Sequence, residues 1–372
     1  MIGKICELNP ISKVDADLFY YIDLGSIDKG KWTEKKIISK SEAPSRAQRV
    51  LKYNDIIFQS VRPYNMGHYL LKNQSDLPVV ASTGFIQLRV TNANADYIYQ
   101  LLYEARFNYN VSLRCTGSNY PAINADSFSK IYIPLPSLEI QQKISDILSA
   151  QDKLIELKQN LIDNKKQQKK WLMHKLLDEC YIKYPLYEII KIADYVDYRG
   201  KTPEKVDNGI LLITAKNVKM GFIDYECSKE YVKISDYKTI MHRGSPKYGD
   251  VLITTEAPCG NVAQITNENI ALAQRIIKYR TKENYSNNFF CFILQSETFQ
   301  SKLKIMSTGG TVQGIKGSLL HKMKIPCPPL KEQTAIAEIL SEQDKEIELL
   351  EKQLTQEKLK KKSLMQLLLT VK

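Results

Sequence analysis

The sequence predicts an α+β protein in which two similar α/β domains are separated by two long antiparallel helices, forming a coiled-coil spacer with pseudo-two-fold symmetry. Three observations lead to this prediction: a stretch that occurs twice, a heptad pattern in each copy, and the same order of short strands in both halves of the 372 residues. We expect the first domain at residues 1–137 and its helix at 138–180. The second domain is expected at 181–329 and its helix at 330–372.

The repeated stretch is found at residues 133–177 and 325–369. The two copies align without a gap, and about half of the aligned positions are identical. A repeat of this length indicates a duplicated domain rather than a solenoid. Each copy opens with prolines, which require extended backbone before a helix begins, and the rest of each copy contains neither Pro nor Gly.

A heptad pattern follows the prolines in both copies. Its core positions are Leu148, Gln151, Ile155, Lys158, Ile162, Lys165, Lys169, Leu172 and Leu176 in the first copy, and Leu340, Gln343, Ile347, Leu350, Leu354, Glu357, Lys361, Leu364 and Leu368 in the second. Such a stripe buries itself only against a partner helix, and its polar members restrict register. A helix of about 40 residues is roughly 60 Å long, which suits a spacer. The alternative is two ordinary amphipathic helices that cap two ordinary domains.

The two domains share an order of elements. In the first we expect strands at residues 17–24, 55–61 and 84–90, a helix at 96–106 and a turn at 115–120. In the second we expect strands at 211–218, 250–258 and 276–281, and partly helical structure at 289–306. A loop dense in Lys and Arg is expected at 31–52, where recognition side chains often lie. Strands and turns recur while the basic loops differ, which favours one architecture that reads two different targets.

The charge of the chain is concentrated in the two domains. The net charge is +12, with 16 basic against 12 acidic residues in 1–137 and 21 against 14 in 181–329, whereas the helical segments are almost neutral. We expect a polyanionic partner, and nucleic acid is favoured over a membrane because no basic amphipathic helix accompanies the charge. A generally basic proteome is the alternative explanation.

Composition also predicts where the protein works and what it lacks. The sequence has no apolar run near 18 residues and no apolar leader, so we expect a cytoplasmic protein without a membrane partner. The seven cysteines are scattered and never form a C-x-x-C pair, so neither a disulfide framework nor a zinc site is indicated. The four histidines, His68, His174, His242 and His321, lie far apart and are expected to be surface or packing residues.

Catalytic motifs are incomplete throughout the sequence. Residues 25–31 match the start of a phosphate-binding loop, but Trp32 stands where a hydroxyl should bind magnesium. Asp250 and Glu256 resemble a nuclease pair, yet Pro258 and Cys259 occupy the place of the required lysine. There is no dinucleotide fingerprint and no clear methyltransferase motif. We therefore expect no catalytic residue, no cofactor and no metal site in this chain, and a binding protein that directs the chemistry of other subunits.

Taken together, these features resemble the specificity (HsdS) subunit of type I restriction-modification systems. The resemblance rests on the prolines that precede the Gln-rich helices, the Gln-Asp-Lys centre of each helix and the Thr-Gly turns. It also rests on the Ser-Arg-Ala stretch at residues 45–47, which precedes Asn-Asp-Ile-Ile at 54–57, and on Arg-Gly-Lys-Thr-Pro at 199–203. It covers essentially the whole chain. One departure is that the first half has no counterpart of residues 184–205.

The resemblance implies that each domain is a target recognition domain that reads one half of a bipartite, asymmetric site in double-stranded DNA. It also implies that the helices set the gap and dock two methyltransferase subunits. These partners would use S-adenosylmethionine, and ATP with magnesium if a restriction and translocase subunit is present. The chain itself would be non-catalytic. Competing hypotheses are the specificity subunit of a related or orphan methyltransferase system, and a non-enzymatic basic scaffold that binds RNA or acidic protein.

Candidate DNA contacts follow from residue chemistry. Arg suits guanine O6 and N7, Asn and Gln suit adenine N6 and N7, and Lys and Arg neutralise phosphates. The predicted DNA-binding residues are Lys31, Arg46, Gln48, Arg49, Arg62 and Tyr64 in the first domain, and Arg199, Lys201, Lys216, Asn217, Arg243, Lys247 and Arg275 in the second.

Overall fold

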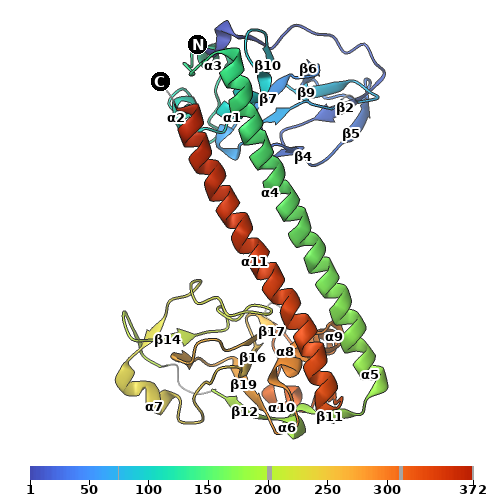
Figure 1. Ribbon diagram of the computed structural model, residues 1–372, viewed down its shortest axis with the longest axis vertical. Coiled ribbons are helices and arrows are strands. Elements are labelled where there is room, and N and C mark those ends of the chain that lie inside the picture. Colours follow the sequence, from blue (N-terminus) through green and yellow to red (C-terminus); the bar gives the residue numbers. More distant parts are fainter. Residues whose placement is uncertain (74, 199–202, 310–312, 371–372) are drawn as a thin grey trace. The chain divides into compact units, whose positions relative to one another are not determined.

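The computed structural model describes residues 1–73, 75–198, 203–309 and 313–370 (Figure 1). The chain divides into two compact units, Met1–Gln159 with Lys352–Lys372, and Asn160–Glu351. Each unit contains one sheet-bearing domain and a part of each long helix. The predicted contacts Arg199 and Lys201 lie outside the described residues.

Two four-stranded sheets form the domain of the first unit. One has the order β1-β10-β7-β8, built from Cys6–Leu8, Phe85–Val90, Ile56–Gln59 and Tyr69–Leu70. The other has the order β5-β2-β9-β6, built from Lys36–Ser39, Leu18–Ile22, Val79–Ser82 and Ala47–Leu51. In this second sheet β2 and β9 run parallel. The remaining elements are η1 (Ile2–Lys4), the hairpin β3 (Ile27–Asp28) and β4 (Lys31–Trp32), η2 (Pro63–Asn65), α1 (Ala95–Leu101), α2 (Ala105–Ser112) and α3 (Ala125–Ser129).

The domain of the second unit repeats this plan. Its sheets have the orders β12-β19-β16-β17 (Ala193–Asp197, Ile276–Thr281, Val251–Thr255, Cys259–Gln264) and β13-β15-β14-β18 (Lys205–Val206, Tyr231–Val232, Ile210–Ile213, Ile270–Leu272). Here β14 and β18 are the parallel pair. A small sheet joins β11 (Leu186–Glu188) to β20 (Lys324–Pro326). The remaining elements are α6 (Ile189–Ile192), η4 (Ile234–Asp236), α7 (Tyr237–Ile240), α8 (Asn287–Gln295), α9 (Glu297–Met306) and α10 (Gly317–Leu320).

Most of the expected elements are present. The strands predicted at 17–24, 55–61, 84–90, 250–258 and 276–281 are β2, β7, β10, β16 and β19. The predicted helix at 96–106 is instead two helices, because the Glu104 carboxylate caps α2 by accepting from the N–H groups of Arg106 and Phe107. The prediction of a basic loop at 31–52 was wrong. The segment contains β4, β5 and β6, and the half-buried Trp32 and Val50 pack against the domain's apolar clusters.

Two long helices carry the repeated stretch. Helix α4 spans Leu138–Met173 and continues through a π-helical turn (His174–Asp178) into α5 (Glu179–Lys183), while α11 spans Leu330–Leu369. A buried glutamine ties each helix start to its domain. Gln141 donates to Pro136 O and accepts from Asn94 N, and Gln333 does the same with Pro328 O and Ser286 N. This explains why glutamine recurs at the start of both copies.

The helices pair in opposite directions within each unit, as predicted. In the first unit Gln151 donates to Glu357 at 2.8 Å and Lys158 to Gln353 at 2.8 Å. In the second unit Lys165 pairs with Glu346 at 2.8 Å. Partner numbers fall as residue numbers rise, which defines an antiparallel pair. The polar heptad positions therefore face the partner helix, and the apolar positions Leu148, Ile162, Leu340, Ile347 and Leu354 are buried.

A buried carboxylate with a bidentate arginine recurs in both domains. Asp55 accepts from Arg89 Nε and Nη2 at 3.0 and 2.7 Å, and Asp250 accepts from the same atoms of Arg280 at 2.7 Å each. Lys278 Nζ also donates to Asp250, at 3.2 Å. Both carboxylates are 1% exposed. Asp250 is thus a structural residue, which removes it from the nuclease pair considered above.

The histidines take the roles expected of them. His68 is buried, stacks on Phe58 with a centroid distance of 4.2 Å, and accepts from Gln59 N through Nδ1. Burial lowers the pKa of His68 to about 3, so this ring is neutral. His321 is buried and hydrogen-bonds Tyr279, whereas His174 and His242 are exposed.

Candidate nucleic-acid interface

In the first domain, loops from both sheets meet at one edge. Ser60, just after β7, donates from its N–H to Gly84 O at 3.1 Å and from its hydroxyl to the same oxygen at 2.7 Å. Thr83 N in turn donates to Arg46 O at 2.8 Å. This chain of hydrogen bonds holds the Arg46 loop beside the segment that carries Arg62. We call the loops 44–47, 60–66, 82–84 and 116–122 the first edge.

Arg62 is held firmly on the first edge. Its backbone has a left-handed φ of 53°, and its N–H donates to Pro121 O at 2.8 Å. Its guanidinium carbon lies 4.3 Å from the centre of the Tyr120 ring, a cation–π contact. Tyr64 follows and is 62% exposed. The edge therefore presents a fixed guanidinium group together with exposed aromatic side chains.

The second domain contains the corresponding edge. Thr255 N donates to Arg275 O at 2.9 Å, so that Arg275 takes the place that Gly84 has in the first domain. Ile315 N donates to Thr255 O as Ile123 N donates to Ser60 O. The Arg275 side chain is 52% exposed and lies 3.4 Å from Glu256. We call the loops 214–217, 242–244, 255–258, 273–275 and 313–316 the second edge.

Parallel pairing brings further predicted residues to the second edge. Ile213 of β14 is opposite Leu272 of β18, and the loops that follow two parallel strands leave from the same edge. The exposed Lys216 therefore lies in the loop next to that of Arg275. Arg243 also lies near this edge, because its Nη1 donates at 2.8 Å to the main-chain oxygen of Asp197. Asp197 pairs with Ile277, near the start of β19, the strand that follows Arg275.

A hollow of about 490 Å³ lies on the second edge. Its lining residues are Thr255, Glu256, Gln274, Arg275, Thr308, Gly314, Ile315 and Lys316. Gln274 and Lys316 were missed by the sequence reasoning. The internal repeat could have identified Lys316, since it directly follows residues 308–315, which match residues 116–123 of the first domain.

Three predicted residues lie away from the edge in the first domain. Gln48 and Arg49 are on β6 and line a separate hollow of about 370 Å³ with residues 9–12. Lys31 is in the β3–β4 hairpin, and no helix follows it, in agreement with the rejection of a phosphate-binding loop.

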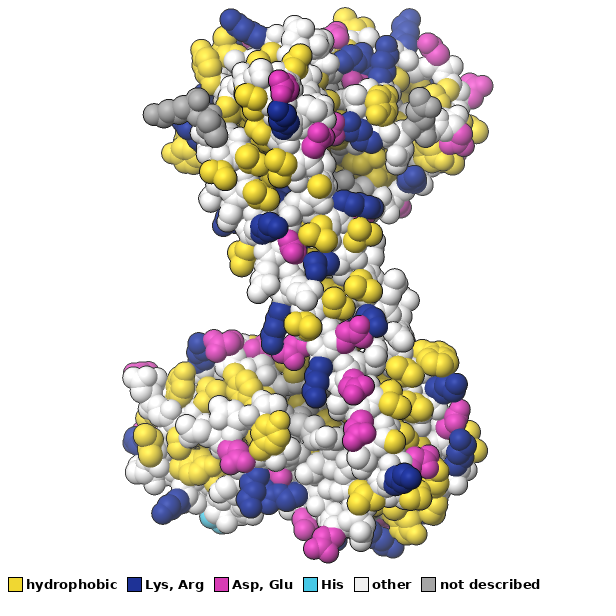
Figure 2. All heavy atoms as spheres, in the orientation of Figure 1, with side chains coloured by type: hydrophobic (Ala, Val, Ile, Leu, Met, Phe, Trp, Pro, Cys, Tyr) yellow, Lys and Arg dark blue, Asp and Glu magenta, His cyan; other side chains and the backbone are white. Residues whose placement is uncertain are grey.

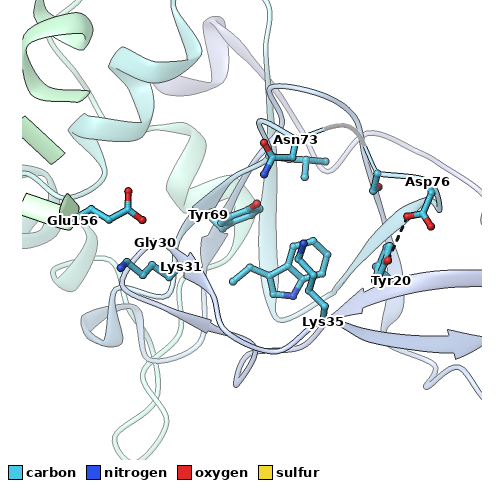
Figure 3. A pocket seen from close by; sticks show the side chains of 11 residues that line it. Tyr20, Gly30, Lys31, Lys35, Tyr69, Asn73, Asp76 and Glu156 are labelled. Atoms are coloured by element: carbon cyan, nitrogen blue, oxygen red, sulfur yellow. Dashed lines mark hydrogen bonds between the residues drawn. The ribbon is translucent and has the colours of Figure 1, made fainter. Parts of the chain in front are cut away.

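Lys31 instead lines a cavity of about 470 Å³ with Tyr20, Trp32 and Tyr69 (Figure 3). The Trp32 ring lies edge-on to both tyrosines, with centroid distances of 5.7 and 6.0 Å. Glu156 of α4 also lines this cavity, and the Lys31 side chain extends toward it. The cavity therefore adjoins the long helix rather than the first edge.

In the second domain, Lys247 lies away from the second edge and Asn217 is buried. Lys247 is exposed, but it lies before the first residue of β16. It is therefore near the end of that strand that is far from Thr255 and the second edge. Asn217 is 0% exposed. Its amide donates to Asp224 O and Ser228 O, and its oxygen accepts from Thr214. The prediction that Asn217 presents its amide to a base is corrected, because every polar atom of this side chain holds the fold of its own loop.

The long helices expose apolar side chains as well as charges (Figure 2). In α4, Ile140, Ile147 and Leu154 recur at seven-residue spacing and are 48%, 46% and 38% exposed, and Leu157 beside them is 53% exposed. This second stripe lies apart from the positions that face α11. Its spacing is that of a contact with another helix.

Among the described residues, no group of three or more His, Cys, Asp or Glu side chains is arranged to hold a metal ion. Within the same residues, no helix is both long and apolar enough to cross a bilayer.

The family model described as the type I restriction modification DNA specificity domain matches residues 8–166 and again residues 179–359. The type I restriction enzyme MjaVIII specificity subunit of Methanocaldococcus jannaschii is 29% identical over 317 residues, which are 79% of this chain and 74% of that protein. The putative MjaX specificity subunit of the same organism is 28% identical over 274 residues, 68% of this chain and 62% of that protein.

Solved structures share the fold over nearly the whole chain. A structure from work on "complex assembly and conformational transition of the type I R-M system" matches with a TM-score of 0.59 at 20% identity, covering 99% of this chain and 96% of the other. The type I restriction-modification S subunit from M. genitalium matches with a TM-score of 0.61 at 13% identity, covering 100% and 95%. With two matched specificity domains, the chain belongs to the family of type I restriction-modification specificity subunits.

Proposed function

We propose that this chain binds double-stranded DNA and reads one half of a bipartite, asymmetric site with each domain. One observation carries the proposal: the same edge is built twice, on the same hydrogen bonds, with different side chains on it. The first edge has Arg46, Arg62 and an aromatic pair, and the second has Lys216, Arg243 and Arg275. A shared scaffold with unlike side chains suits the reading of two unlike sequences.

The chemistry of these edges fits duplex DNA. Arginine can bind guanine O6 and N7 in the major groove, and lysine neutralises phosphates. We place Arg46, Arg62, Tyr64, Lys216, Arg243 and Arg275 in direct contact with the DNA, together with Lys316. Lys31, Gln48, Arg49 and Lys247 lie elsewhere on their domains and would contact only flanking phosphates. Arg199 and Lys201, which lie outside the described residues, stay in the set as sequence predictions.

The proposal assigns the chemistry to partner subunits. The exposed stripe of α4 supports docking of a helix from a methyltransferase subunit, and the two copies of the domain suggest two such subunits. The partners would supply S-adenosylmethionine binding, and ATP with magnesium where a restriction subunit joins them. This chain would itself be non-catalytic and would act in the cytoplasm, with the DNA.

The test is to sequence methylated sites in cells that contain the methyltransferase subunit with each of three variants. We expect Arg62→Ala to relax or abolish one half-site and Arg275→Ala the other, because a lost bidentate contact costs about 1–3 kcal/mol, or about fivefold to 150-fold. Lys130→Ala is the control, since Lys130 is exposed and pairs with Asp126 of its own helix turn. The proposal fails if both arginine variants alter the same half-site or neither alters any.

A further inference from the structure

Glu256 is an acidic residue on a surface that is otherwise basic. It is the one acidic residue in the loops of the second edge, which also contain Lys216, Arg243, Arg275 and Lys316. It lines the hollow of this edge together with Arg275 and Lys316. The loops of the first edge contain no Asp or Glu. The rejected nuclease pair leaves this carboxylate without a role, so its position needs another explanation.

The backbone at Glu256 has the same pairing in both domains. Glu256 forms an antiparallel bridge with Gly314, just as Val61 does with Ala122 in the first domain. A Cβ atom on Gly314 would lie 3.4 Å from Glu256 Cγ, so the glycine leaves room for the longer side chain. Since Val61 forms the same bridge, the scaffold does not require a carboxylate at this position.

Glu256 forms a loose ion pair with Arg275. Arg275 Nε lies 3.4 Å from Glu256 Oε2, and the two side chains are 52% and 42% exposed. The structural pair of this domain is different: Arg280 donates twice to Asp250 at 2.7 Å, and that carboxylate is 1% exposed. A half-exposed pair at 3.4 Å contributes little stability, and both groups retain hydrogen-bonding capacity toward a ligand.

Main-chain contacts fix the two groups side by side. Thr255 N donates to Arg275 O at 2.9 Å, and Ile315 N donates to Thr255 O at 2.9 Å. Arg275 itself has a left-handed backbone, with a φ of 75°. Because Glu256 directly follows Thr255, its carboxylate and the guanidinium group leave neighbouring points of the same edge. The hollow is therefore lined by an acceptor beside a donor.

The chemistry of base edges identifies what such a pair of side chains can read. A carboxylate repels the phosphates of DNA, so it suits a DNA-binding surface only where it accepts a hydrogen bond from a base. The donors in the major groove are the amino groups on cytosine N4 and adenine N6, whereas guanine presents O6 and N7 as acceptors that suit arginine. Guanine O6 and cytosine N4 are hydrogen-bonded to each other in a G·C pair, so an acceptor and a donor lie side by side there.

We propose that Glu256 is a specificity-determining residue and that, with Arg275, it reads one G·C base pair in the half-site of the second domain. Arg275 donates to guanine O6 and N7, and Glu256 accepts from N4 of the paired cytosine. The inference rests on the proposed function, which places the second edge against the duplex. The first edge, which has no acidic residue, would read its half-site without such a pair.

Competition binding to four duplexes tests the inference. The full chain with its methyltransferase subunit is bound to the methylated sequence, and the duplexes carry each of the four base pairs at the position that Arg275→Ala relaxes. We expect the wild-type chain to prefer G·C. Arg275→Ala should bind G·C and T·A about equally and reject the other two, because Glu256 still accepts from cytosine N4 or adenine N6 on the opposite strand.

A substitution of Glu256 completes the test. Glu256→Val copies the first domain's residue on the same bridge, and we expect it to keep the preference for G·C but to reduce it by about tenfold. With Arg275→Ala added, all four duplexes should bind alike. Glu283→Gln is the matched control, since Glu283 is exposed and follows β19 at the end opposite Arg275. It should keep the full wild-type preference.

The outcomes separate this inference from the proposed function. An unchanged preference in Glu256→Val, or equally stronger binding of all four duplexes, overturns the reading of cytosine. If Arg275→Ala binds all four duplexes alike, Glu256 only orients Arg275, and the inference is wrong; this result decides even if Glu256→Val does not fold. A wild-type preference for a pair other than G·C also overturns it. If Arg275→Ala alters neither half-site, the proposed function of the second edge fails, and the inference falls with it.

Discussion

Single buried polar residues determine much of this fold. Asp250 shows how: burial by itself would raise the pKa of its carboxyl, but hydrogen bonds from Arg280 and the Lys247 backbone N–H, with the charges of Lys278 and Arg280, hold the pKa below its ordinary value of 3.8. The folded protein therefore binds a proton here less readily than the unfolded chain. The stability contributed by Asp250 is fully present above its ordinary pKa and is lost as the pH falls through the folded value.

This linkage predicts a specific change in acid sensitivity. We expect the free energy of unfolding of the wild-type chain to fall as the pH drops from about 5 to 3. The Asp250→Asn variant should have a lower free energy of unfolding than wild type at neutral pH, and this free energy should change less between these two pH values. Urea unfolding at a series of pH values measures it. Asp194→Asn, whose carboxylate is 82% exposed, should follow the wild-type curve. Parallel curves for wild type and Asp250→Asn would contradict the assignment.

The sequence could predict where a candidate residue lies along the chain better than whether its side chain is exposed. Arg62 follows the predicted strand β7 and Arg275 precedes the predicted strand β19, and their contact with DNA stays a prediction. Asn217 is buried, since its hydrogen bonds involve Asp224 and Ser228, which the sequence gives no reason to place beside it. Lys31 was assigned to a recognition loop, but a two-stranded hairpin places it near α4.

At the scale of whole elements, periodicity was the most informative signal. The heptad pattern predicted both long helices and their antiparallel pairing, because apolar and oppositely charged positions recur over many turns. The second stripe of α4 was not predicted, since exposed apolar positions are visible only once the buried face is known. The sheets were predicted in part: short strands such as β5 and β6 have no strong alternation, and only tertiary pairing with β2 and β9 identifies them.

A charged heptad position contacts the partner helix in the second unit, where Lys169 donates to Asp344. We expect Lys169→Glu to lower the free energy of unfolding by about 1 kcal/mol, since the Lys169 side chain is only 17% exposed and a like-charge pair replaces an ion pair. The double swap Lys169→Glu with Asp344→Lys should restore at least half of the loss. Thermal unfolding at low and high salt measures both effects.

A matched control for the swap is Lys153→Glu. Lys153 is exposed and pairs with Glu156 one turn away on its own helix, so we expect a change below about 0.5 kcal/mol. A swap variant no more stable than Lys169→Glu alone would show that the pair does not determine register.

For the whole molecule, the repeated order of domain, helix, domain and helix leads to a prediction about DNA sites. If the helices set the gap between half-sites, removing one heptad from each helix must shorten the gap and leave the half-sites unchanged. Residues 159–165 of α4 and 346–352 of α11 form a suitable pair, because Lys158 contacts Gln353 just outside both segments. Their removal keeps the heptad phase, since seven residues leave the core positions in register.

One heptad corresponds to about 10 Å of helix, or about three base pairs of B-DNA. We therefore expect methylated sites in cells with the shortened chain to keep both half-site sequences with a gap about three base pairs shorter. A two-residue deletion in each helix is the control, because it turns the core positions by about half a turn and should abolish methylation rather than change the gap. Sites with the original gap in the shortened chain would mean that the partner subunits, and not these helices, fix the distance between the two half-sites.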